Sequence, residues 1–135
     1  MIIRTEAEMI EYGRKLAHQL HPPLVIELLG DVGTGKTTLV RGIAEGLGIS
    51  EPITSPSFVI NKKYHTPHNF TLSHYDFYRL DDPGIMSAEL DESINDPQTI
   101  TIIEWAESVA NVLPEHTTIT IKYLEDGSRK LESTQ

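Results

Sequence analysis

The feature that most constrains this chain is a glycine-rich stretch between an apolar run and an amphipathic segment. Residues 30–37 read Gly-Asp-Val-Gly-Thr-Gly-Lys-Thr and fit the pattern G-x-x-x-x-G-K-[ST], whose main-chain amides cradle phosphate groups. The apolar run Leu24–Leu29 predicts a buried strand before the loop. Apolar residues at three- and four-residue steps predict a helix after it, ending near residues 46–48. This strand–loop–helix order is the context that a phosphate-binding loop requires.

The residue types in this loop each have a chemical role. The glycines permit backbone torsions that other residues avoid, and successive N–H groups then point into one concavity at the positive end of a helix. Lys36 supplies a positive charge to the β- and γ-phosphates, and the Thr37 hydroxyl is placed to ligate Mg²⁺. A plain turn needs neither residue, so we expect a nucleotide site here. Its expected contacts are Asp31, Val32, Gly33, Thr34, Gly35, Lys36, Thr37 and Thr38.

Composition narrows the class of protein further. The chain has 135 residues, a length that predicts one domain over residues 1–135. Its net charge of −9 argues against direct binding to nucleic-acid phosphates, so any role with RNA is expected to run through a partner. There is no cysteine, no apolar run of membrane-spanning length and no signal-peptide segment at the start of the sequence. We therefore expect a cytoplasmic protein.

The rest of the chain alternates between helical and extended patterns. Such alternation predicts an α/β fold, and the two strands on either side of a turn near Pro67 predict an antiparallel hairpin. Thr5 and Glu8 form a capping-box pair at the start of the first helix. The predicted helices cover residues 5–20, 85–94 and 106–113, and the predicted strands cover residues 58–64, 70–77, 99–103, Thr117–Tyr123 and 128–132.

Two acids lie where predicted strands end. Asp76 falls in the segment 74–79, and Glu104 follows the β-branched run 99–103. Ligands of open α/β sheets bind outside the carboxyl ends of the parallel strands, which suits Glu104. Asp76 joins the site only if its strand, even an antiparallel one, runs to the same crevice. Hydrolysis of a nucleotide needs a carboxylate for the metal and a group that orients water, and these two acids are the candidates.

Other residues near these motifs keep two interpretations. The hydroxyls of residues 54–57 either reach Mg²⁺ or the γ-phosphate or belong to a rigid turn. Trp105 packs either on the nucleotide or in the core. His74 either orients Asp76 or fills a face of the sheet. Arg41 and Arg79 are candidates for an arginine finger, unless a partner supplies one.

In combination these motifs resemble the TsaE family, formerly called YjeE, from the first helix to about residue 125. The family's Gly-Asp-x-Gly-x-Gly-Lys-Thr-Thr matches residues 30–38. Its Ser-Pro-Thr-[FY] matches residues 55–58, where Ser57 replaces the usual threonine and keeps the hydroxyl. Its His-x-Asp-x-Tyr-Arg matches residues 74–79, and its Glu-Trp matches Glu104 and Trp105.

The resemblance implies a P-loop NTPase-like three-layer α/β fold with a mixed sheet and antiparallel additions. It implies an ATPase of low intrinsic turnover that binds ATP and Mg²⁺, with Ser57 and Trp105 among the nucleotide contacts. Lys36, Asp76 and Glu104 would be catalytic, and Thr37, Asp76 and Glu104 would serve the metal. The implied partners are TsaB and TsaD, which transfer a threonylcarbamoyl group to adenosine 37 of tRNA. The resemblance also implies that ATP hydrolysis resets that complex, so contact with tRNA would be indirect.

Two other functions fit a phosphate-binding loop. One is a nucleotide-gated binding module whose hydrolysis is incidental. The other is a small-molecule kinase, which the lack of a basic lid segment disfavours. A GTPase is disfavoured too, because the guanine-reading Asn-Lys-x-Asp is absent and residues 61–64 read Asn-Lys-Lys-Tyr.

Overall fold

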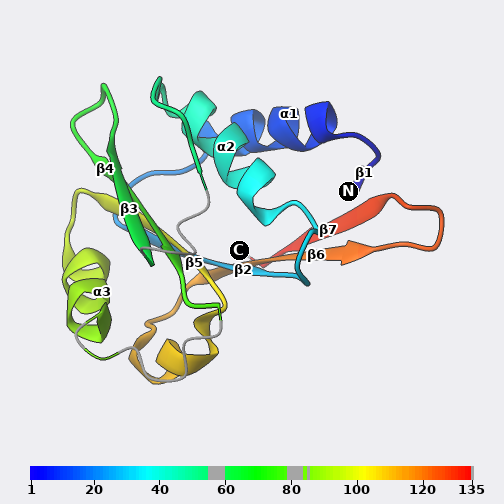
Figure 1. Cartoon of the computed structure of the whole chain (residues 1–135). Coiled ribbons are helices and arrows are strands. Elements are labelled where there is room, and N and C mark those ends of the chain that lie inside the picture. Colours follow the sequence, from blue (N-terminus) through cyan, green and yellow to red (C-terminus); the bar gives the residue numbers. More distant parts are fainter. Residues whose placement is uncertain (55–59, 79–83, 85, 135) are drawn as a thin grey trace.

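The computed structural model describes residues 1–54, 60–78, 84 and 86–134. Their strands form one seven-stranded sheet with the order β1-β7-β6-β2-β5-β4-β3 (Figure 1). The elements are β1 Ile2–Ile3, α1 Glu6–Ala17, β2 Leu24–Leu29, α2 Lys36–Gly46, β3 Asn61–His65, β4 Thr71–Asp76, α3 Met86–Asn95, β5 Thr99–Glu104, the 3₁₀ helix η1 Ala106–Val112, β6 Thr117–Tyr123 and β7 Arg129–Ser133.

The centre of the sheet is parallel and its edges are antiparallel. Strand β2 pairs in parallel with β5 on one side and with β6 on the other, and β4 pairs in parallel with β5. Strand β3 is antiparallel to β4, β7 to β6, and β1 to β7. The carboxyl ends of four parallel strands therefore meet at one edge of the sheet, as they do around ligand sites in α/β proteins. The mixed sheet and the antiparallel hairpin expected from the sequence are confirmed.

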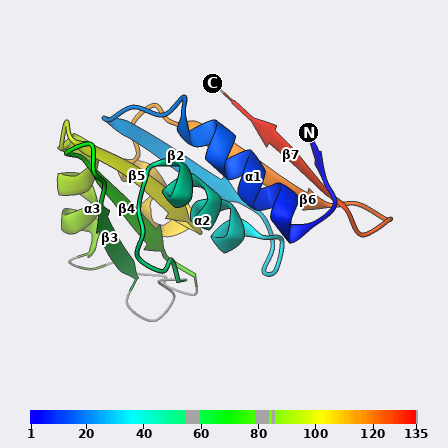
Figure 2. The same ribbon diagram turned by 90° about the horizontal axis from the view of Figure 1, so that it is seen from above.

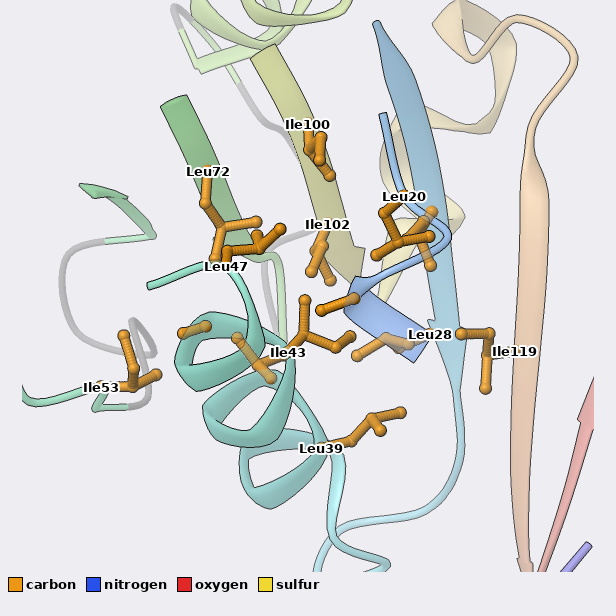
Figure 3. Packing of buried hydrophobic residues seen from close by; sticks show 14 of the residues in the cluster. Leu20, Leu28, Leu39, Ile43, Leu47, Ile53, Leu72, Ile100, Ile102 and Ile119 are labelled. Carbon is orange, nitrogen blue, oxygen red and sulfur yellow. The ribbon is translucent and has the colours of Figure 1, made fainter. Parts of the chain in front are cut away.

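Helices cover both faces of the sheet, which gives three layers. Helices α1 and α2 lie side by side on one face, and α3 and η1 lie on the other (Figures 1 and 2). The larger core fills the space under α1 and α2, where Leu39 and Ile43 pack toward Leu28 and Ile102 (Figure 3). The smaller core joins Tyr75 and the strand residues around it to Leu90 of α3 and to η1. Burial of the apolar faces of these helices and strands is the main stabilising term of such a fold.

Helices α1 and α2 approach each other closely because glycines line their contact. A Cβ atom on Gly42 would lie 2.4 Å from the carbonyl oxygen of Ile10, and one on Gly13 would lie 2.8 Å from the backbone nitrogen of Ile43. Ion pairs flank this contact, with Arg14 Nε 2.9 Å from Glu45 and Arg41 Nη1 3.1 Å from Glu6. The helix that follows the phosphate-binding loop is thus packed backbone against backbone on its neighbour.

Some predicted boundaries were wrong. The helix predicted over residues 5–20 ends at Ala17; its expected start is confirmed, since Thr5 Oγ1 accepts a hydrogen bond of 3.1 Å from the Glu8 N–H. The strand predicted over residues 58–64 begins at Asn61, after Ile60 with a φ of 71°; residues 58 and 59 lie outside the described part. The strand predicted over residues 70–77 covers Thr71–Asp76.

Five further elements differ from their predictions. Strand β5 covers Thr99–Glu104 instead of residues 99–103, and β7 covers Arg129–Ser133 instead of residues 128–132. Helix α3 was expected over residues 85–94 and covers Met86–Asn95, with residue 85 outside the described part. The helix predicted over residues 106–113 is the 3₁₀ helix η1, in keeping with the use of 3₁₀ turns as short connectors. Strand β1 was not predicted, because two residues are too few to show a pattern and only pairing with β7 makes them a strand. No helix among the described residues has the length and apolarity needed to cross a membrane.

Candidate nucleotide-binding site

The loop between β2 and α2 has the conformation of a phosphate cradle. Gly33 and Gly35 adopt φ angles of 82° and 107°, a region that residues with a Cβ rarely enter. The Thr34 N–H and hydroxyl both donate to the Asp31 carbonyl, at 3.2 and 2.9 Å, and close the turn. The loop ends at the first turn of α2, where unpaired N–H groups and the helix dipole favour an anion.

The hairpin between β6 and β7 fastens this loop from one side. The Tyr123 hydroxyl donates to the Gly33 carbonyl, and Arg129 Nη2 lies 3.4 Å from the same oxygen. The Arg129 guanidinium also lies 5.0 Å from the centre of the Tyr123 ring, within the range of a cation–π contact. Two side chains from the far end of the sequence therefore hold the loop through a single carbonyl oxygen.

Lys36 lies at the centre of the site and is largely buried. Its ammonium donates to the Gly30 carbonyl, lies 3.4 Å from the Asp31 carbonyl and stands 4.0 Å above the ring of Trp105. Burial lowers the pKa of Lys36, while the negative charges of Glu104 and Asp76 act in the opposite direction. The charge that a phosphate group would meet is thus already oriented into the site.

Asp76 and Glu104 meet at the same end of the sheet. They are paired residues on the adjacent parallel strands β4 and β5, and 5% and 3% of their surfaces are exposed. The Tyr78 N–H donates to Asp76 Oδ1 at 2.9 Å, and His74 Nε2 lies 2.5 Å from Glu104 Oε2. The condition set for Asp76 is met, because its strand runs parallel to β5 and ends at the same crevice.

Trp105 follows Glu104 in an unusual backbone conformation. Its φ is 57° and its ψ 55°, in the left-handed region, where a residue other than glycine costs about 1–3 kcal/mol. The turn brings the indole over Lys36 and to 4.8 Å, between ring centres, from Tyr78. Both interpretations offered for Trp105 fit the structure, because the ring lines the pocket beside Lys36 and also packs against the smaller core.

These side chains surround one pocket of about 760 Å³. Its size suits a small-molecule or cofactor ligand. It combines one lysine and one arginine with two buried carboxylates, so both a polyphosphate and a cation find complementary groups. The lining residues are Glu6, Met9, Val32, Gly33, Gly35, Lys36, Thr37, Thr38, Asp76, Tyr78, Glu104, Trp105 and Arg129.

Most residues predicted for the site line this pocket, with a few exceptions. Asp31 and Thr34 are not among the described lining residues, and the Thr34 hydroxyl donates to the Asp31 carbonyl within the loop. Ser57 and Arg79 lie outside the described residues. Arg41 pairs with Glu6 and is not part of the described lining.

Four lining residues were missed by the sequence reasoning. Tyr78 lies inside the segment 74–79 and was quoted without a role. Glu6 and Met9 belong to α1, where Met9 was expected only on the apolar face of the helix and Glu6 was given no role. Arg129 is a single cation on a return strand, and no local pattern separates it from the neighbouring Lys130. Its place in the pocket depends on the pairing of β7 with β6.

Comparison with known proteins gives a consistent result. A family model described as "Threonylcarbamoyl adenosine biosynthesis protein TsaE" matches residues 3–131. The tRNA threonylcarbamoyladenosine biosynthesis protein TsaE of Treponema pallidum is 36% identical over 132 residues, with 96% of each chain covered. The protein of the same name from Nostoc sp. is 38% identical, with 93% of this chain and 78% of the relative covered.

A solved structure agrees with the sequence matches. The crystal structure of Bacillus subtilis YdiB superposes with a TM-score of 0.81 at 32% identity, covering 97% of this chain and 80% of that one. With its family-model match over nearly the whole length, this chain belongs to the TsaE family.

Proposed function

We propose that this protein binds and hydrolyses ATP with Mg²⁺ in support of the threonylcarbamoylation of adenosine 37 in tRNA. Membership of the TsaE family supports the pathway. The observation that carries the activity is the convergence of Lys36, Asp76 and Glu104 on one pocket at the mouth of the phosphate-binding loop. Phosphoryl transfer relies on positioning and charge stabilisation, and these three groups supply both signs of charge.

Each group has a distinct proposed role. The loop amides and the Lys36 ammonium hold the phosphates. The Thr37 hydroxyl and the Asp76 carboxylate hold Mg²⁺, which prefers hard oxygen donors such as these. Held there, the ion would neutralise charge on the phosphate oxygens. Glu104, the residue paired with Asp76 in the sheet, would orient the attacking water and contribute to the coordination of the metal.

Trp105 and Arg129 complete the proposed nucleotide contacts. Arg129 adds a second cation on the wall formed by β7, beside the Gly33 carbonyl. The Trp105 ring flanks Lys36 and closes one side of the pocket. Ser57 keeps its predicted role as a contact to metal or phosphate.

The partner proposal is the TsaB–TsaD pair, with tRNA reached through that complex. The net charge of −9 supports this arrangement, because a chain with an excess of acids is repelled by an RNA backbone. In this proposal ATP hydrolysis resets the partner complex and the threonylcarbamoyl transfer itself takes place elsewhere.

The proposal is tested by measuring ATP hydrolysis with Mg²⁺, with and without the TsaB–TsaD pair, for the wild type and Lys36→Ala. We expect slow turnover that rises with the partners, and loss of nucleotide binding or turnover in the variant. Wild-type hydrolysis by Lys36→Ala would remove the loop from the mechanism. A pull-down of TsaB–TsaD with and without ATP tests the partnership, and failure to capture the pair under either condition would contradict it.

A further inference from the structure

A buried histidine holds one of the two acids of the pocket. His74 lies on β4, two residues before Asp76, and none of its surface is exposed. Its Nε2 lies 2.5 Å from Glu104 Oε2, and only 3% of Glu104 is exposed. In the sheet register His74 is opposite Ile102, so its ring reaches diagonally across to the acid at the end of β5.

The hydrogen bonding of the ring points to a single task. Among the described residues, His74 Nδ1 has no hydrogen-bond partner although it is buried. The pattern matches an imidazole whose Nε2–H donates to the Glu104 carboxylate and whose Nδ1 carries no hydrogen. Within the described part of the chain, His74 thus directs its one side-chain hydrogen bond to this carboxylate.

The same bond distinguishes the two oxygens of Glu104. Oε2 is held by the ring, and no described residue donates to Oε1, while Glu104 as a whole lines the pocket. A glutamate side chain loses considerable rotamer freedom when it is fixed, and a short hydrogen bond at its tip selects one rotamer before any ligand arrives. His74 itself is not among the described lining residues, so its influence on the pocket passes through Glu104.

We infer that His74 is a positioning residue for hydrolysis: it fixes the Glu104 carboxylate so that its second oxygen faces the attacking water. The inference rests on the proposed ATPase function. Groups that orient the ligands of a metal or reaction centre typically affect affinity or activity by about 10–100-fold when removed. Among the described residues, His74 makes no hydrogen bond to the phosphate-binding loop or to Lys36. Its removal is therefore expected to lower kcat rather than the affinity for nucleotide.

The test compares three variants of His74 and one control variant by steady-state ATP hydrolysis and by binding of ADP. His74→Leu removes the hydrogen bond, His74→Gln keeps a donor near the position of Nε2, and His74→Asn has an amide too short to reach Glu104. We expect His74→Leu and His74→Asn to lower kcat by about 10–100-fold with ADP affinity within about 3-fold of wild type, and His74→Gln to recover most of kcat.

His116→Gln is the matched control. It alters the other histidine–glutamate contact of the described chain, in which His116 Nε2 lies 3.0 Å from Glu27 outside the pocket lining. We expect its kcat to equal that of the wild type.

Each outcome bears on the inference. Unchanged kcat in His74→Leu, or equal losses in the Gln and Asn variants, would overturn the positioning role. A loss of ADP affinity as large as the loss of kcat would also overturn the positioning role, because it would indicate that His74 serves packing. If His74→Leu fails to fold, the comparison of kcat between His74→Gln and His74→Asn tests the positioning role instead. Wild-type protein without any ATP hydrolysis would overturn the proposed function, and with it this inference, whereas active wild type with an active Leu variant would overturn the inference alone.

Discussion

Asp76 and Glu104 are opposite each other on two adjacent parallel strands, and each is the last residue of its strand. Two buried carboxylates at neighbouring strand ends repel each other unless cations lie close by. Lys36 is such a cation, and its pKa responds to both acids. The arrangement is therefore electrostatically suited to a divalent ion and a phosphate group together.

The two acids are expected to differ in function. Glu104→Ala should keep ATP binding and lower hydrolysis by about 100-fold or more, because a group that orients or activates water typically contributes 10²–10⁴-fold. Binding measured by calorimetry and turnover measured by phosphate release separate the two effects. Glu92→Ala, an exposed acid on α3, is the control and should behave as wild type. Equal losses of binding and turnover in Glu104→Ala would leave the acid with a structural role only.

If that hydrolysis-deficient variant still supported threonylcarbamoylation, the protein would be a nucleotide-gated binding module.

Arg129 is expected to contribute to nucleotide affinity. Hydrogen bonds that involve a charged group are worth about 1.5–3 kcal/mol, so Arg129→Ala should weaken ATP binding by roughly 10–100-fold. Lys130→Ala is the matched control, because Lys130 is exposed on the same strand and pairs at 3.4 Å with Glu132. Titration of each variant with ATP measures the effect. Equal affinities for the two variants would place Arg129 outside the binding machinery.

Trp105 offers a direct optical signal for events at Lys36. It is the single tryptophan of the chain, and the Lys36 ammonium lies 4.0 Å from the centre of its ring. A phosphate that engages this ammonium changes the charge above the indole, so titration with MgATP should shift or quench the tryptophan emission. Lys36→Ala should give no saturable change. A saturable change of wild-type size in that variant would show that the signal arises from another contact.

Gly42 is expected to be intolerant of even a methyl group. A Cβ atom there would lie 2.4 Å from the Ile10 carbonyl, and both partners are helix backbone that cannot move aside easily. Gly42→Ala should lower the free energy of unfolding by about 1–3 kcal/mol, as overpacking does in other cores. Lys15→Ala on the exposed side of α1 should change it by less than about 0.5 kcal/mol. Chemical denaturation of both variants measures the difference, and equal stability would mean that α1 and α2 separate without cost.

His116 predicts a pH dependence of stability. Burial acts to lower the pKa of His116, but its hydrogen bonds to the Pro114 carbonyl and to Glu27 outweigh burial and raise the pKa above 6.5. A raised folded-state pKa means that the protonated ring stabilises the fold below pH 6.5, and that this contribution disappears as the pH rises through the folded-state value. The stability difference between wild type and His116→Gln should therefore be larger at acidic than at alkaline pH. A difference that grows with rising pH would contradict the assignment.

The sequence was most informative where the interactions are local. The strand, loop and helix around Lys36 lie within 23 consecutive residues, Leu24–Gly46, and their periodicity, glycines and hydroxyls describe nearly all of their structure. The cap at Thr5 and the hairpin of β3 and β4 depend on neighbours a few residues away and were also predictable. The exact ends of strands and the 3₁₀ form of η1 were not, because small differences in packing decide them.

What the sequence by itself determined is a phosphate-binding loop, an α/β alternation and two acids at strand ends. What only the tertiary structure decided is which side chains meet that loop. Tyr123 and Arg129 reach the loop because the hairpin of β6 and β7 lies beside β2, and His74 reaches Glu104 because β4 pairs with β5. The physical reason is that strand pairing and burial join residues distant in the chain, as with Gly33 and Arg129, which are separated by 96 positions. No local pattern carries that information.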